Sequence, residues 1–453
     1  MPVTWSKLHA DALAAAFDAL ESARLDWMVL RNYRGLPQSC NSKDIDIGVS
    51  PADFRRAEKV ITEAVRQHGF DRRQTTVYQR FRCSTYFGIV EGRPVSIKID
   101  LIDGFSWRGA DWFPVKRLNR ARQTYNGFQV PGPTDNAVML WLKPLTTGAG
   151  VKPAYVDSIL EAVRDDPDGF RAEIERLFSP DLARQAWQAL EAGELDRLIP
   201  LRKKLAWNAW WRTVRAEPLQ SVWGIGVYVW LELLRRSCRP EGTFLAVLGP
   251  DGVGKTTFLE ELRHQLAALQ VKDPENVEIR HFRPHVFPNL NALLTGKPDV
   301  HDGRPSVPHQ APPANPASSL LRLIYYWADY VWGYWGGAHK RSVAGRTIIY
   351  DRYFYDFLVD PRRSRLSLPP WITRMFIRLT PQPDLVFILA ADPETIYSRK
   401  QELPRQEIAR QLEEYRSLHD SNPSRFVMFD ATLPVHEIVG EAMTAIVKRL
   451  YKK

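Results

Sequence analysis

The chain has 453 residues, of which 44% are hydrophobic and 25% charged, which allows about two to four globular domains and excludes a largely disordered chain. Its net charge of +10 favours anionic partners such as nucleotides, nucleic acid or a lipid surface, although dispersed, solvated cations would give the same balance. Three cysteines without metal-ligand spacing, no signal-peptide core and no apolar run of about 20 residues predict a cytoplasmic protein without a disulfide framework or a transmembrane segment.

Residues 1–133 alternate helical and strand patterns, which predicts one α/β domain. Asp44 and Asp46 stand in one strand-like segment, and Asp100 stands in another, Val95-Ser-Ile-Lys-Ile-Asp-Leu101. Alternation along two strands would place these three carboxylates on one face of a sheet. Because they would repel one another without cations between them, the pattern predicts a divalent-metal site. A solvated strand end is the alternative interpretation.

This arrangement resembles the nucleotidyltransferase superfamily over about residues 25–109, whose members carry a paired Asp-x-Asp and a third aspartate on a later strand. The resemblance implies that Asp44, Asp46 and Asp100 hold Mg²⁺ ions that clamp a nucleoside triphosphate. Leu30-Arg-Asn-Tyr33 stands where the family carries Gly-Ser, so a small phosphate-cradling turn is replaced. Lys143 and Lys152 would meet the triphosphate as in similar enzymes, or are plain surface charges.

Residues 134–240 have long helical periodicities, for example over 154–163 and 182–190, and predict a helical module followed by a linker. The end of this segment is rich in tryptophan and arginine. Such helices rest on membranes or stack on nucleic acid in some proteins, but burial between domains is the interpretation that the pattern favours. The residues concerned are Trp207, Trp210, Trp211, Trp223 and Trp230 with Arg212, Arg215, Arg235 and Arg236.

Residues 241–453 alternate buried-strand and helix patterns, which predicts a mainly parallel sheet covered by helices. The expected strands are residues 244–248, 347–350, 385–389 and 426–429. A proline-rich stretch over 305–316 predicts a long loop inside this domain. The fold class expected for the whole chain is therefore α/β, with a mixed sheet first, helices in the middle and a parallel sheet last.

A glycine-rich loop follows the first of these strands and precedes an amphipathic helical pattern over 258–269. The spacing Gly249-x-x-x-x-Gly254-Lys255-Thr256 fits the Walker A pattern, in which backbone N–H groups surround phosphates at a helix N-terminus. Lys255 would neutralise phosphate charge and Thr256 would bind Mg²⁺. The pattern predicts an ATP site with Mg²⁺, and a turn without a nucleotide is the alternative. The expected nucleotide-binding residues are Gly249, Gly252, Val253, Gly254, Lys255, Thr256 and Thr257.

Two charged segments follow. Asp351 and Arg352 end a predicted strand, where an aspartate can hold Mg²⁺ and an arginine can bind phosphate oxygens; a structural ion pair is the alternative. Arg399, Lys400 and Arg405 surround a predicted hinge before a helix that Pro404 initiates, which indicates a basic lid or a solvated helix face.

Residues 243–453 resemble the thymidylate kinase-like branch of P-loop kinases. The motifs are Gly-x-Asp-Gly-x-Gly-Lys-Thr-Thr, then Asp-Arg-Tyr, then Asp-Pro-Glu followed by Arg-Lys-x-Glu-x-Pro. The resemblance implies a carboxylate near the reacting phosphates, an acceptor-side arginine, two lid arginines and a turn beside the adenine. These roles would belong to Asp251, Arg352, Arg399 with Arg405, and Asp430 with Thr432, respectively.

The expected acceptor site departs from thymidylate kinases, because Arg280-His-Phe-Arg-Pro-His285 stands where they show Arg-Glu-Pro-Gly-Gly. His281 and Arg283 suit an anionic or hydroxylated acceptor, and the pattern is similar to kinase relatives of surface-polysaccharide or sugar-phosphate pathways; structural histidines are the alternative. An aromatic helix over 320–335 should lie mostly in the core. Its Arg322 and Asp329 are candidate acceptor contacts, since charges are costly to bury unpaired.

The sequence thus favours an ATP- and Mg²⁺-dependent phosphotransferase acting on a small acceptor, such as a sugar, a sugar phosphate or a glycan end, with a nucleotidyltransferase-like N-terminal head. Two alternatives stay open: a nucleoside monophosphate (dTMP-type) kinase with a regulatory N-terminal domain, and a non-catalytic interaction protein gated by ATP. A homodimer is expected, nucleic acid is not an expected partner, and peripheral membrane contact is left open.

Overall fold

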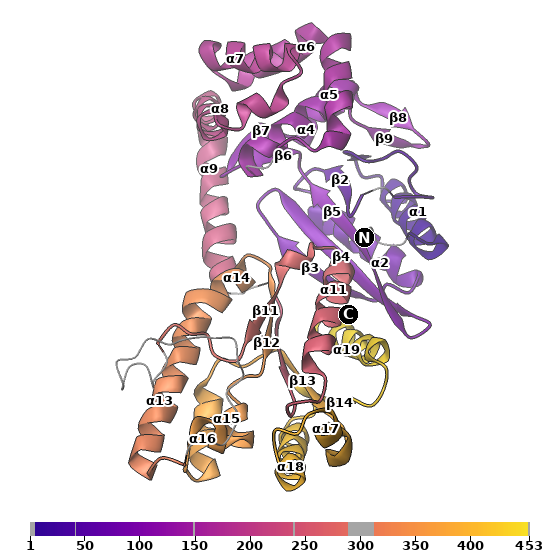
Figure 1. The fold of residues 1–453 in the computed structure, drawn as a ribbon. Coiled ribbons are helices and arrows are strands. Elements are labelled where there is room, and N and C mark those ends of the chain that lie inside the picture. The colour runs from indigo at the N-terminus through magenta and orange to yellow at the C-terminus, as the bar shows by residue number, and fades with distance from the viewer. Residues whose placement is uncertain (1–4, 41, 148–149, 239–240, 289–311, 452–453) are drawn as a thin grey trace. The chain divides into compact units, whose positions relative to one another are not determined.

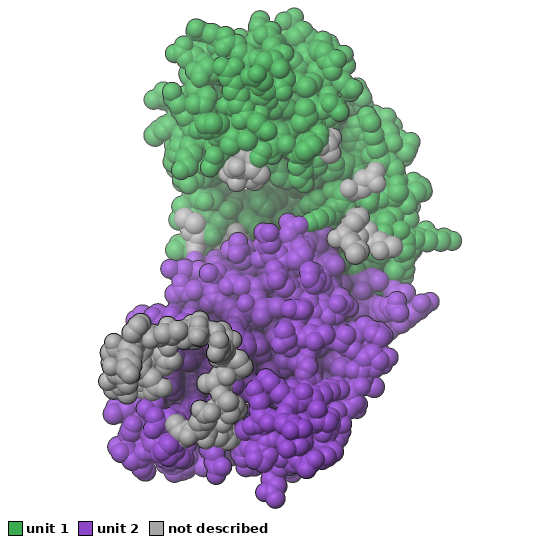
Figure 2. All heavy atoms as spheres, in the orientation of Figure 1, with its two compact units in different colours: residues 1–88, 96–236, 453 green, residues 89–95, 237–452 purple. Residues whose placement is uncertain are grey.

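The computed structural model describes residues 5–40, 42–147, 150–238, 241–288 and 312–451 (Figure 1). The chain divides into two compact units, shown in different colours in Figure 2. Unit 1 comprises residues 1–88 and 96–236, and unit 2 comprises residues 237–452 with residues 89–95. The predicted α/β class is confirmed, because unit 1 has a mixed sheet followed by helices and unit 2 has a parallel sheet covered by helices.

The main sheet of unit 1 has the described strands in the order β1-β2-β5-β4-β3. Strand β2 is antiparallel to β1 and parallel to β5, and β3 is antiparallel to β4. The parallel register places Asp46 opposite Asp100, so two of the predicted metal-binding carboxylates come from adjacent strands. The strand bounds are β1 Trp27–Val29, β2 Ile45–Val49, β3 Arg72–Val77, β4 Phe81–Val90 and β5 Arg93–Ile102.

Helices α4 to α8 of unit 1 share a buried core with some of its strands. Met28 of β1, Trp112 of β7 (Ala110–Phe113), Trp141 of α4 (Pro133–Thr147) and Phe170 of α6 (Pro167–Leu177) belong to the same buried cluster. Large aromatic side chains bury much apolar area, so this cluster ties the helical segment to the strands. The predicted helices at 154–163 and 182–190 fall within α5 and α7. The other elements are α1 Lys7–Ser22, α2 Phe54–Gln67, β6 Phe105–Trp107, α3 Val115–Leu118, the 3₁₀ turn η1 Asn119–Ala121, β8 Gln123–Tyr125, β9 Phe128–Val130, α5 Pro153–Asp165, α7 Pro180–Glu191, the 3₁₀ turn η2 Leu195–Leu198, α8 Arg202–Ala216, α9 Pro218–Tyr228, the π-helix η3 Val229–Arg235 and α10 Arg236–Cys238.

The described strands of unit 2 form a parallel sheet in the order β11-β12-β10-β13-β14. The chain runs from β10 to β11 and β12 on one side, and then to β13 and β14 on the other. Open α/β sheets bind ligands at the carboxyl ends of the strands where the order switches in this way, here beside β10. The bounds are β10 Phe244–Leu248, β11 Val277–His281, β12 Thr347–Asp351, β13 Leu385–Ala390 and β14 Phe426–Asp430.

Sequence analysis predicted four of these strands but missed β11. This strand is Val-Glu-Ile-Arg-His, and three of its five residues are charged or ionisable. Among the described strands it lies at the edge of the sheet and pairs with β12 alone. An edge strand tolerates polar side chains, so its hydrophobic signal is weak.

Helices cover both faces of this sheet (Figure 1). Phe244, Ala246 and Leu248 of β10 belong to a buried cluster with Tyr330 of α13 (Pro316–Gly333). On the opposite face, α11 (Lys255–Leu269) packs against α19 (Val435–Leu450). Helix α13 starts before the predicted 320, and the predicted loop at 305–316 lies mostly outside the described residues. The remaining elements are the 3₁₀ turns η4 Pro274–Asn276 and η6 Pro361–Ser364, the π-helix η5 Tyr334–Ala338, and α14 His339–Val343, α15 Asp356–Val359, α16 Pro370–Leu379, α17 Pro393–Arg399 and α18 Arg405–Ser421.

Within the described ranges, every helix is too short or too polar to cross a bilayer.

A buried ion cluster joins three segments of unit 1. The guanidinium of Arg80 donates to the carboxylates of Asp103 and Asp111, both nearly inaccessible to solvent. Burial raises the pKa of Asp103 to about 6, although Arg80 opposes that shift, and burial also raises the pKa of Asp111. The one arginine therefore compensates two desolvated acids.

We expect Arg80→Met to destabilise unit 1 by about 3–5 kcal/mol near neutral pH, because two buried carboxylates lose their cation. A carboxyl whose pKa is raised on folding stabilises the folded state at low pH, and that contribution is lost as pH rises. The loss in the variant should therefore be smaller at about pH 5 than at about pH 8, measured by urea unfolding. Arg122→Met, which breaks the exposed pair with Asp26, should change the midpoint little at either pH. An equal loss for Arg80→Met at both pH values would contradict this account.

Candidate functional site

The glycine-rich loop after β10 has the backbone that a phosphate-binding loop requires. Gly252 and Gly254 adopt φ values of 88° and 106°, in the left-handed region that glycine tolerates best. A Cβ on Gly252 would lie 2.8 Å from Lys400 Cβ, so a side chain there would push against the segment after α17. Gly254 caps the N-terminus of α11, and the helix dipole therefore favours an anion in front of the loop.

Lys255 is the first residue of α11 and its side chain is buried under the loop. Its Nζ donates to the carbonyl oxygens of Gly249 and Pro250, each at 2.8 Å, and lies 3.8 Å from Asp251 Oδ1. Burial and the nearby Arg352 lower the pKa of Lys255 to about 8, against the opposing effect of the neighbouring carboxylates. The ammonium is thus held at the loop, and the next residue, Thr256, is exposed.

Asp251 lies at the centre of a charged network. Arg352, just after β12, donates to Asp251 and also to Asp356 Oδ2 at 2.8 Å. Arg363 donates to the second oxygen of Asp251 at 2.7 Å. Burial favours the protonated form of Asp251, but Arg352, Lys255 and Arg363 hold its pKa well below the ordinary value. Asp251 is therefore a fixed anion among three cations.

Arg352 is held in an uncommon backbone conformation, with φ at 70°. Its amide donates to the carbonyl of Val247 at 2.9 Å, which joins the ends of β12 and β10. Non-glycine residues in the left-handed region persist where surrounding contacts enforce them, and such residues cluster at functional sites. Here the two carboxylate partners fix the guanidinium beside the glycine-rich loop.

Asp351 ends β12 next to this network. Its Oδ2 lies 2.7 Å from Nδ1 of the exposed His281, and its Oδ1 is buried without a hydrogen-bond partner among the described residues. Burial raises the pKa of Asp351, but the His281 hydrogen bond and Lys255 outweigh burial and hold the pKa below its ordinary value. A buried anionic oxygen that lacks a donor is a suitable ligand for Mg²⁺, and with Thr256 it forms the donor set expected from the sequence.

The predicted lid arginines have different surroundings. Arg399 Nη1 lies 3.4 Å from the carbonyl of Val253 and 3.3 Å from that of Ala431, so it links the glycine-rich loop to the turn after β14. That turn is closed by Asp430, whose Oδ1 accepts from the amide of Thr432 at 2.9 Å. Arg405 is exposed and pairs with Glu394 at 2.6 Å, away from the loop carbonyls. Arg399, Asp430 and Thr432 therefore lie near one another at the loop.

The predicted acceptor residues Arg283 and Asp329 form an ion pair with each other. Arg283 Nε donates to Asp329 Oδ2 at 3.1 Å, and Asp329 Oδ1 accepts from the amide of Phe287 at 2.8 Å. Both side chains are buried, and the guanidinium of Arg283 also lies over the ring of Tyr326. Arg322, on the same helix as Asp329, is buried, and its Nε has no hydrogen-bond partner in the part of the chain that the structure describes. The ion pair with Arg283 therefore compensates the buried charge of Asp329, because burying an unpaired charge is costly.

Two side chains of this network, Arg363 and His281, have partners that the sequence did not predict. Arg363 lies on η6, far along the chain from the glycine-rich loop, and only the fold brings it to Asp251. The pair Arg362-Arg363 carries no spacing that distinguishes the bound arginine from its exposed neighbour. His281 was predicted as an acceptor contact, and the structure places it on Asp351.

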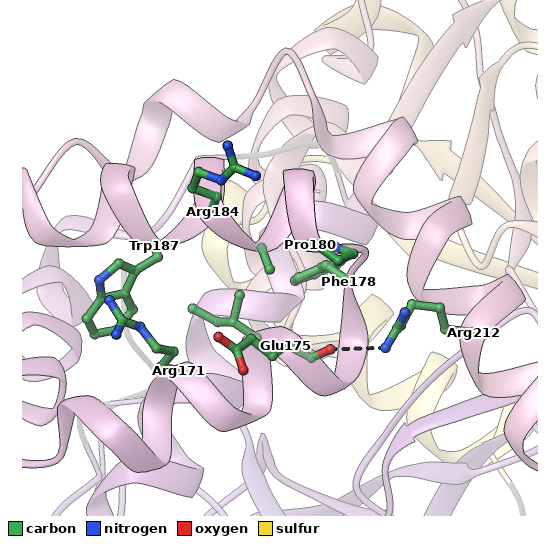
Figure 3. A pocket seen from close by; sticks show the side chains of 9 residues that line it. Arg171, Glu175, Phe178, Pro180, Arg184, Trp187 and Arg212 are labelled. Carbon is green, nitrogen blue, oxygen red and sulfur yellow. Dashed lines mark hydrogen bonds between the residues drawn. The ribbon is translucent and has the colours of Figure 1, made fainter.

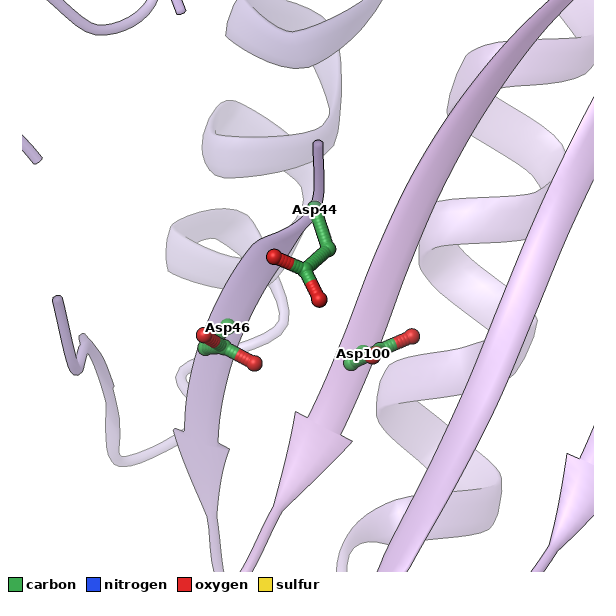
Figure 4. A group of neighbouring side chains, drawn as sticks. All are labelled: Asp44, Asp46 and Asp100. Atoms are coloured by element: carbon green, nitrogen blue, oxygen red, sulfur yellow. The ribbon is translucent and has the colours of Figure 1, made fainter. Parts of the chain in front are cut away.

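The three aspartates of unit 1 lie together, as predicted (Figure 4). Each offers a carboxylate oxygen, and these three oxygens all lie within 4.8 Å of one another. Asp46 and Asp100 come from the adjacent parallel strands β2 and β5, and Asp44 immediately precedes β2. Asp100 Oδ1 is buried without a hydrogen-bond partner within the described ranges, and burial raises the pKa of Asp100 to about 7. The oxygen donors and their spacing fit a divalent cation.

Two cations that the sequence analysis did not single out neutralise this triad. Lys98 Nζ lies 3.5 Å from Asp44 Oδ2 and 3.4 Å from Asp100 Oδ2, and Arg31 donates to Asp46. Lys98 precedes Asp100 by two residues on β5, so strand alternation, the argument that grouped the aspartates, also places the lysine on their face. Desolvation and Arg31 lower the pKa of Lys143, whereas Asp46 and Asp44 raise it, so this lysine lies within electrostatic range of the triad.

A separate cavity of about 410 Å³ lies among α6, α7 and α8 of unit 1 (Figure 3). Apolar and aromatic residues form part of its lining, and Arg212 is fixed at its edge by donating to the backbone carbonyl of Glu175 at 3.1 Å. None of the site residues predicted from the sequence lines it. The lining residues are Arg171, Ile174, Glu175, Phe178, Pro180, Ala183, Arg184, Trp187 and Arg212.

Comparison with known proteins gives limited further information. No protein-family model matches the chain. Among solved structures, it is similar to the crystal structure of thymidylate kinase from Ehrlichia chaffeensis, with 16% sequence identity and a TM-score of 0.31. The match covers 45% of this chain and 98% of that chain. A likeness of this degree fixes neither an activity nor a substrate.

We expect the triad of unit 1 to bind Mn²⁺, used as a paramagnetic substitute for Mg²⁺, and Asp100→Asn to weaken that binding at least about tenfold because one anionic ligand is lost. Lys98→Gln should instead strengthen binding, since the ammonium competes with the metal for Asp44 and Asp100. Electron paramagnetic resonance of free Mn²⁺ measures both effects. Asp71→Asn, which changes an exposed carboxylate outside the cluster, is the control. Weaker binding in Lys98→Gln would show that the lysine supports the metal site rather than opposing it.

Proposed function

We propose that the chain is an ATP- and Mg²⁺-dependent phosphotransferase whose active site lies at the carboxyl edge of the unit 2 sheet. The observation that carries this proposal is the convergence of the glycine-rich loop, Lys255, Asp351 and the Asp251–Arg352–Arg363 network beside β10. Phosphoryl transfer is catalysed mainly by positioning and charge neutralisation, and this edge supplies fixed cations with a fixed anion between them. The motifs of residues 243–453, which resemble those of thymidylate kinase-like P-loop kinases, also support this proposal.

In this proposal the residues have separate roles. The loop amides and Lys255 would hold the phosphates of ATP, and Thr256 and Asp351 would hold Mg²⁺, which would supply charge neutralisation when bound. Arg399 and the Asp430–Thr432 turn would contact the nucleoside, and Arg405 would act from α18 as a lid contact. Arg352 and Arg363 neutralise the transferring group from the acceptor side.

The charge state of Asp251 limits the mechanism. An acceptor hydroxyl oxygen bonds to the γ-phosphorus, the bond from that phosphorus to the β–γ bridging oxygen breaks, and ADP leaves with the bridging oxygen. The hydroxyl proton passes to water as the new phosphate ester forms. Because three cations hold the pKa of Asp251 low, this carboxylate is a poor proton acceptor. Its role is to orient the two arginines and accept a hydrogen bond from the acceptor, which suits a loose transition state that needs little base catalysis.

The proposed acceptor is a small hydroxylated molecule, such as a sugar, a sugar phosphate or a glycan end. His281 is exposed at the end of β11 while its Nδ1 is held by Asp351, which leaves Nε2 to contact an acceptor. Arg283 and Asp329 compensate each other, so we assign them to shaping the acceptor site, with Arg322 on the same helix, rather than to binding acceptor charge.

For unit 1 we propose a second, metal-dependent activity, nucleotidyl transfer to a related substrate. The close set of Asp44, Asp46 and Asp100 supports it, since two-metal sites stabilise both the attacking and the leaving oxygens of a phosphoryl displacement. Lys98 and Arg31 would have to release these carboxylates or share them with the metal ions. The alternatives are a dTMP-type kinase with a regulatory first unit, and an ATP-gated protein without turnover.

Phosphorus NMR of the full chain with Mg-ATP and pooled sugars, sugar phosphates and dTMP separates these possibilities. We expect ADP and a new phosphomonoester, lowered on the order of 100-fold or more in Lys255→Ala because the phosphate-binding cation is lost. Pyrophosphate that disappears in the Asp44→Asn/Asp46→Asn variant would establish the activity of unit 1. Phosphorylated dTMP alone would favour the nucleotide kinase, and ATP binding without either product would favour the gated protein.

Arg363→Met should lower the phosphotransfer rate at least about tenfold, because one of the cations on Asp251 and the transferring group is removed. The protein should stay folded, since Arg352 still compensates Asp251. Arg362→Met is the matched control: the side chain is adjacent and exposed, and its removal should change the rate less than about twofold. Initial rates of ADP release measure both. Equal rates in the two variants would remove Arg363 from the active site.

A further inference from the structure

One helical segment of unit 1 presents a row of apolar side chains to solvent. Helix α9 and the π-helix η3 together cover residues 218–235. Trp223 is 75% exposed and Trp230 is 64% exposed, which is unusual for the largest apolar side chain. The exposed apolar residues recur at intervals of one, three, four and seven and so follow one side of the helix. They are Leu219, Val222, Trp223, Val229, Trp230 and Leu234.

The opposite side of α9 is fixed to unit 1. A Cβ on Gly224 would lie 2.2 Å from the carbonyl oxygen of Gly109, so the helix backbone packs directly against the turn between β6 and β7. Gln220 Nε2 donates to Asp111 Oδ2 at 3.0 Å, which connects the helix to the buried Arg80 cluster. Helix α9 therefore has one buried side and one apolar exposed side, and the anchored side holds the exposed row in place.

Cationic side chains flank the apolar row along the chain. Lys203, Lys204 and Arg215 on α8 are exposed, and Arg235 is exposed at the end of η3. Arg215 lies 5.9 Å from the ring centre of Trp211, itself 52% exposed. The carboxylate of Glu232 faces inward, toward the amide of Gln79 at 3.4 Å. The described residues from α8 to η3 thus expose tryptophan, aliphatic side chains and more cations than anions, with Glu217 an exposed acid between α8 and α9.

We propose that the exposed side of α9 and η3 is a membrane-binding surface that lies in the interface of an anionic lipid bilayer. An amphipathic helix binds in this way when its apolar side enters the boundary between headgroups and acyl chains and its basic residues meet anionic headgroups. Tryptophan favours this boundary because one end of its ring is apolar and the indole N–H is polar. The segment lies on the bilayer rather than across it, in agreement with the lack of a spanning helix in the described part of the chain.

The composition of the row favours lipid over two other occupants. Single-stranded nucleic acid is bound through aromatic stacking, which does not use Leu219, Val222 or Leu234. A second copy of the chain across a two-fold axis would bring like-charged flanks together, which is unfavourable. Anionic lipid meets both the aliphatic row and the cations, as charge complementarity requires.

The test is flotation of the full chain with vesicles of phosphatidylcholine and phosphatidylglycerol, compared with vesicles of phosphatidylcholine alone. We expect binding to the anionic vesicles that weakens as salt is added. The Trp223→Ser/Trp230→Ser variant should lose at least about tenfold in partitioning, because two interfacial anchors are removed. The matched control is Trp332→Ser/Trp371→Ser, which removes two tryptophans of unit 2 that are 63% and 65% exposed. This control should partition like the wild type.

Each variant is compared with the wild type by thermal unfolding and by size-exclusion chromatography. The substituted side chains are exposed, so the unfolding midpoints should agree. Failure of the wild type to float, or equal flotation of both double variants, would overturn the proposal. An oligomer that only Trp223→Ser/Trp230→Ser disrupts, without vesicle binding, would overturn it in favour of self-association. None of these readouts depends on phosphotransfer, so this proposal and the proposed function can fail separately.

Discussion

The candidate active site of unit 2 depends on one buried interaction, the guanidinium of Arg352 between the carboxylates of Asp251 and Asp356. A buried cation requires anionic partners, and buried anions require a cation, so no member of this group can be removed alone without a large cost. Because Arg352 follows β12 and Asp251 follows β10, the same interaction fixes the glycine-rich loop relative to the next strand. It also keeps Asp251 ionised, which determines what that carboxylate can do in a reaction.

The aspartates of unit 1 are also compensated by nearby cations, but here the carboxylates outnumber the cations. Here three carboxylates on adjacent strands have two cations among them, Lys98 and Arg31. These cations stabilise the cluster, but they compete with a metal ion for the same carboxylates. Unit 2 thus has an anion held among cations, which suits binding of phosphate. Unit 1 has anions partly neutralised by cations, so binding of a metal there depends on how easily Lys98 is displaced.

The surface of α9 shows how burial arguments from sequence can fail. The tryptophan-rich segment predicted burial between domains, because tryptophan usually removes much apolar area from water. That prediction is wrong for Trp223 and Trp230, which are largely exposed. The buried side of α9 is formed instead by small residues such as Gly224, whose missing side chain allows close backbone contact with Gly109. A composition argument identifies a helix that needs an apolar partner, but it does not say which side the fold has already covered.

The sequence by itself determined the elements whose signals are local. The strand, loop and helix around Gly249 to Lys255 were predictable because the apolar run, the glycines and the helical periodicity lie within one short segment. The grouping of Asp44, Asp46 and Asp100 followed from strand alternation. Tertiary structure alone decided the partners. The contact of Arg363 with Asp251, the pairing of Arg283 with Asp329, and the position of β11 at the sheet edge join residues far apart in the chain. Such contacts depend on packing and on the compensation of buried charge. Neither of these produces a regular residue spacing, so the sequence pattern does not predict them.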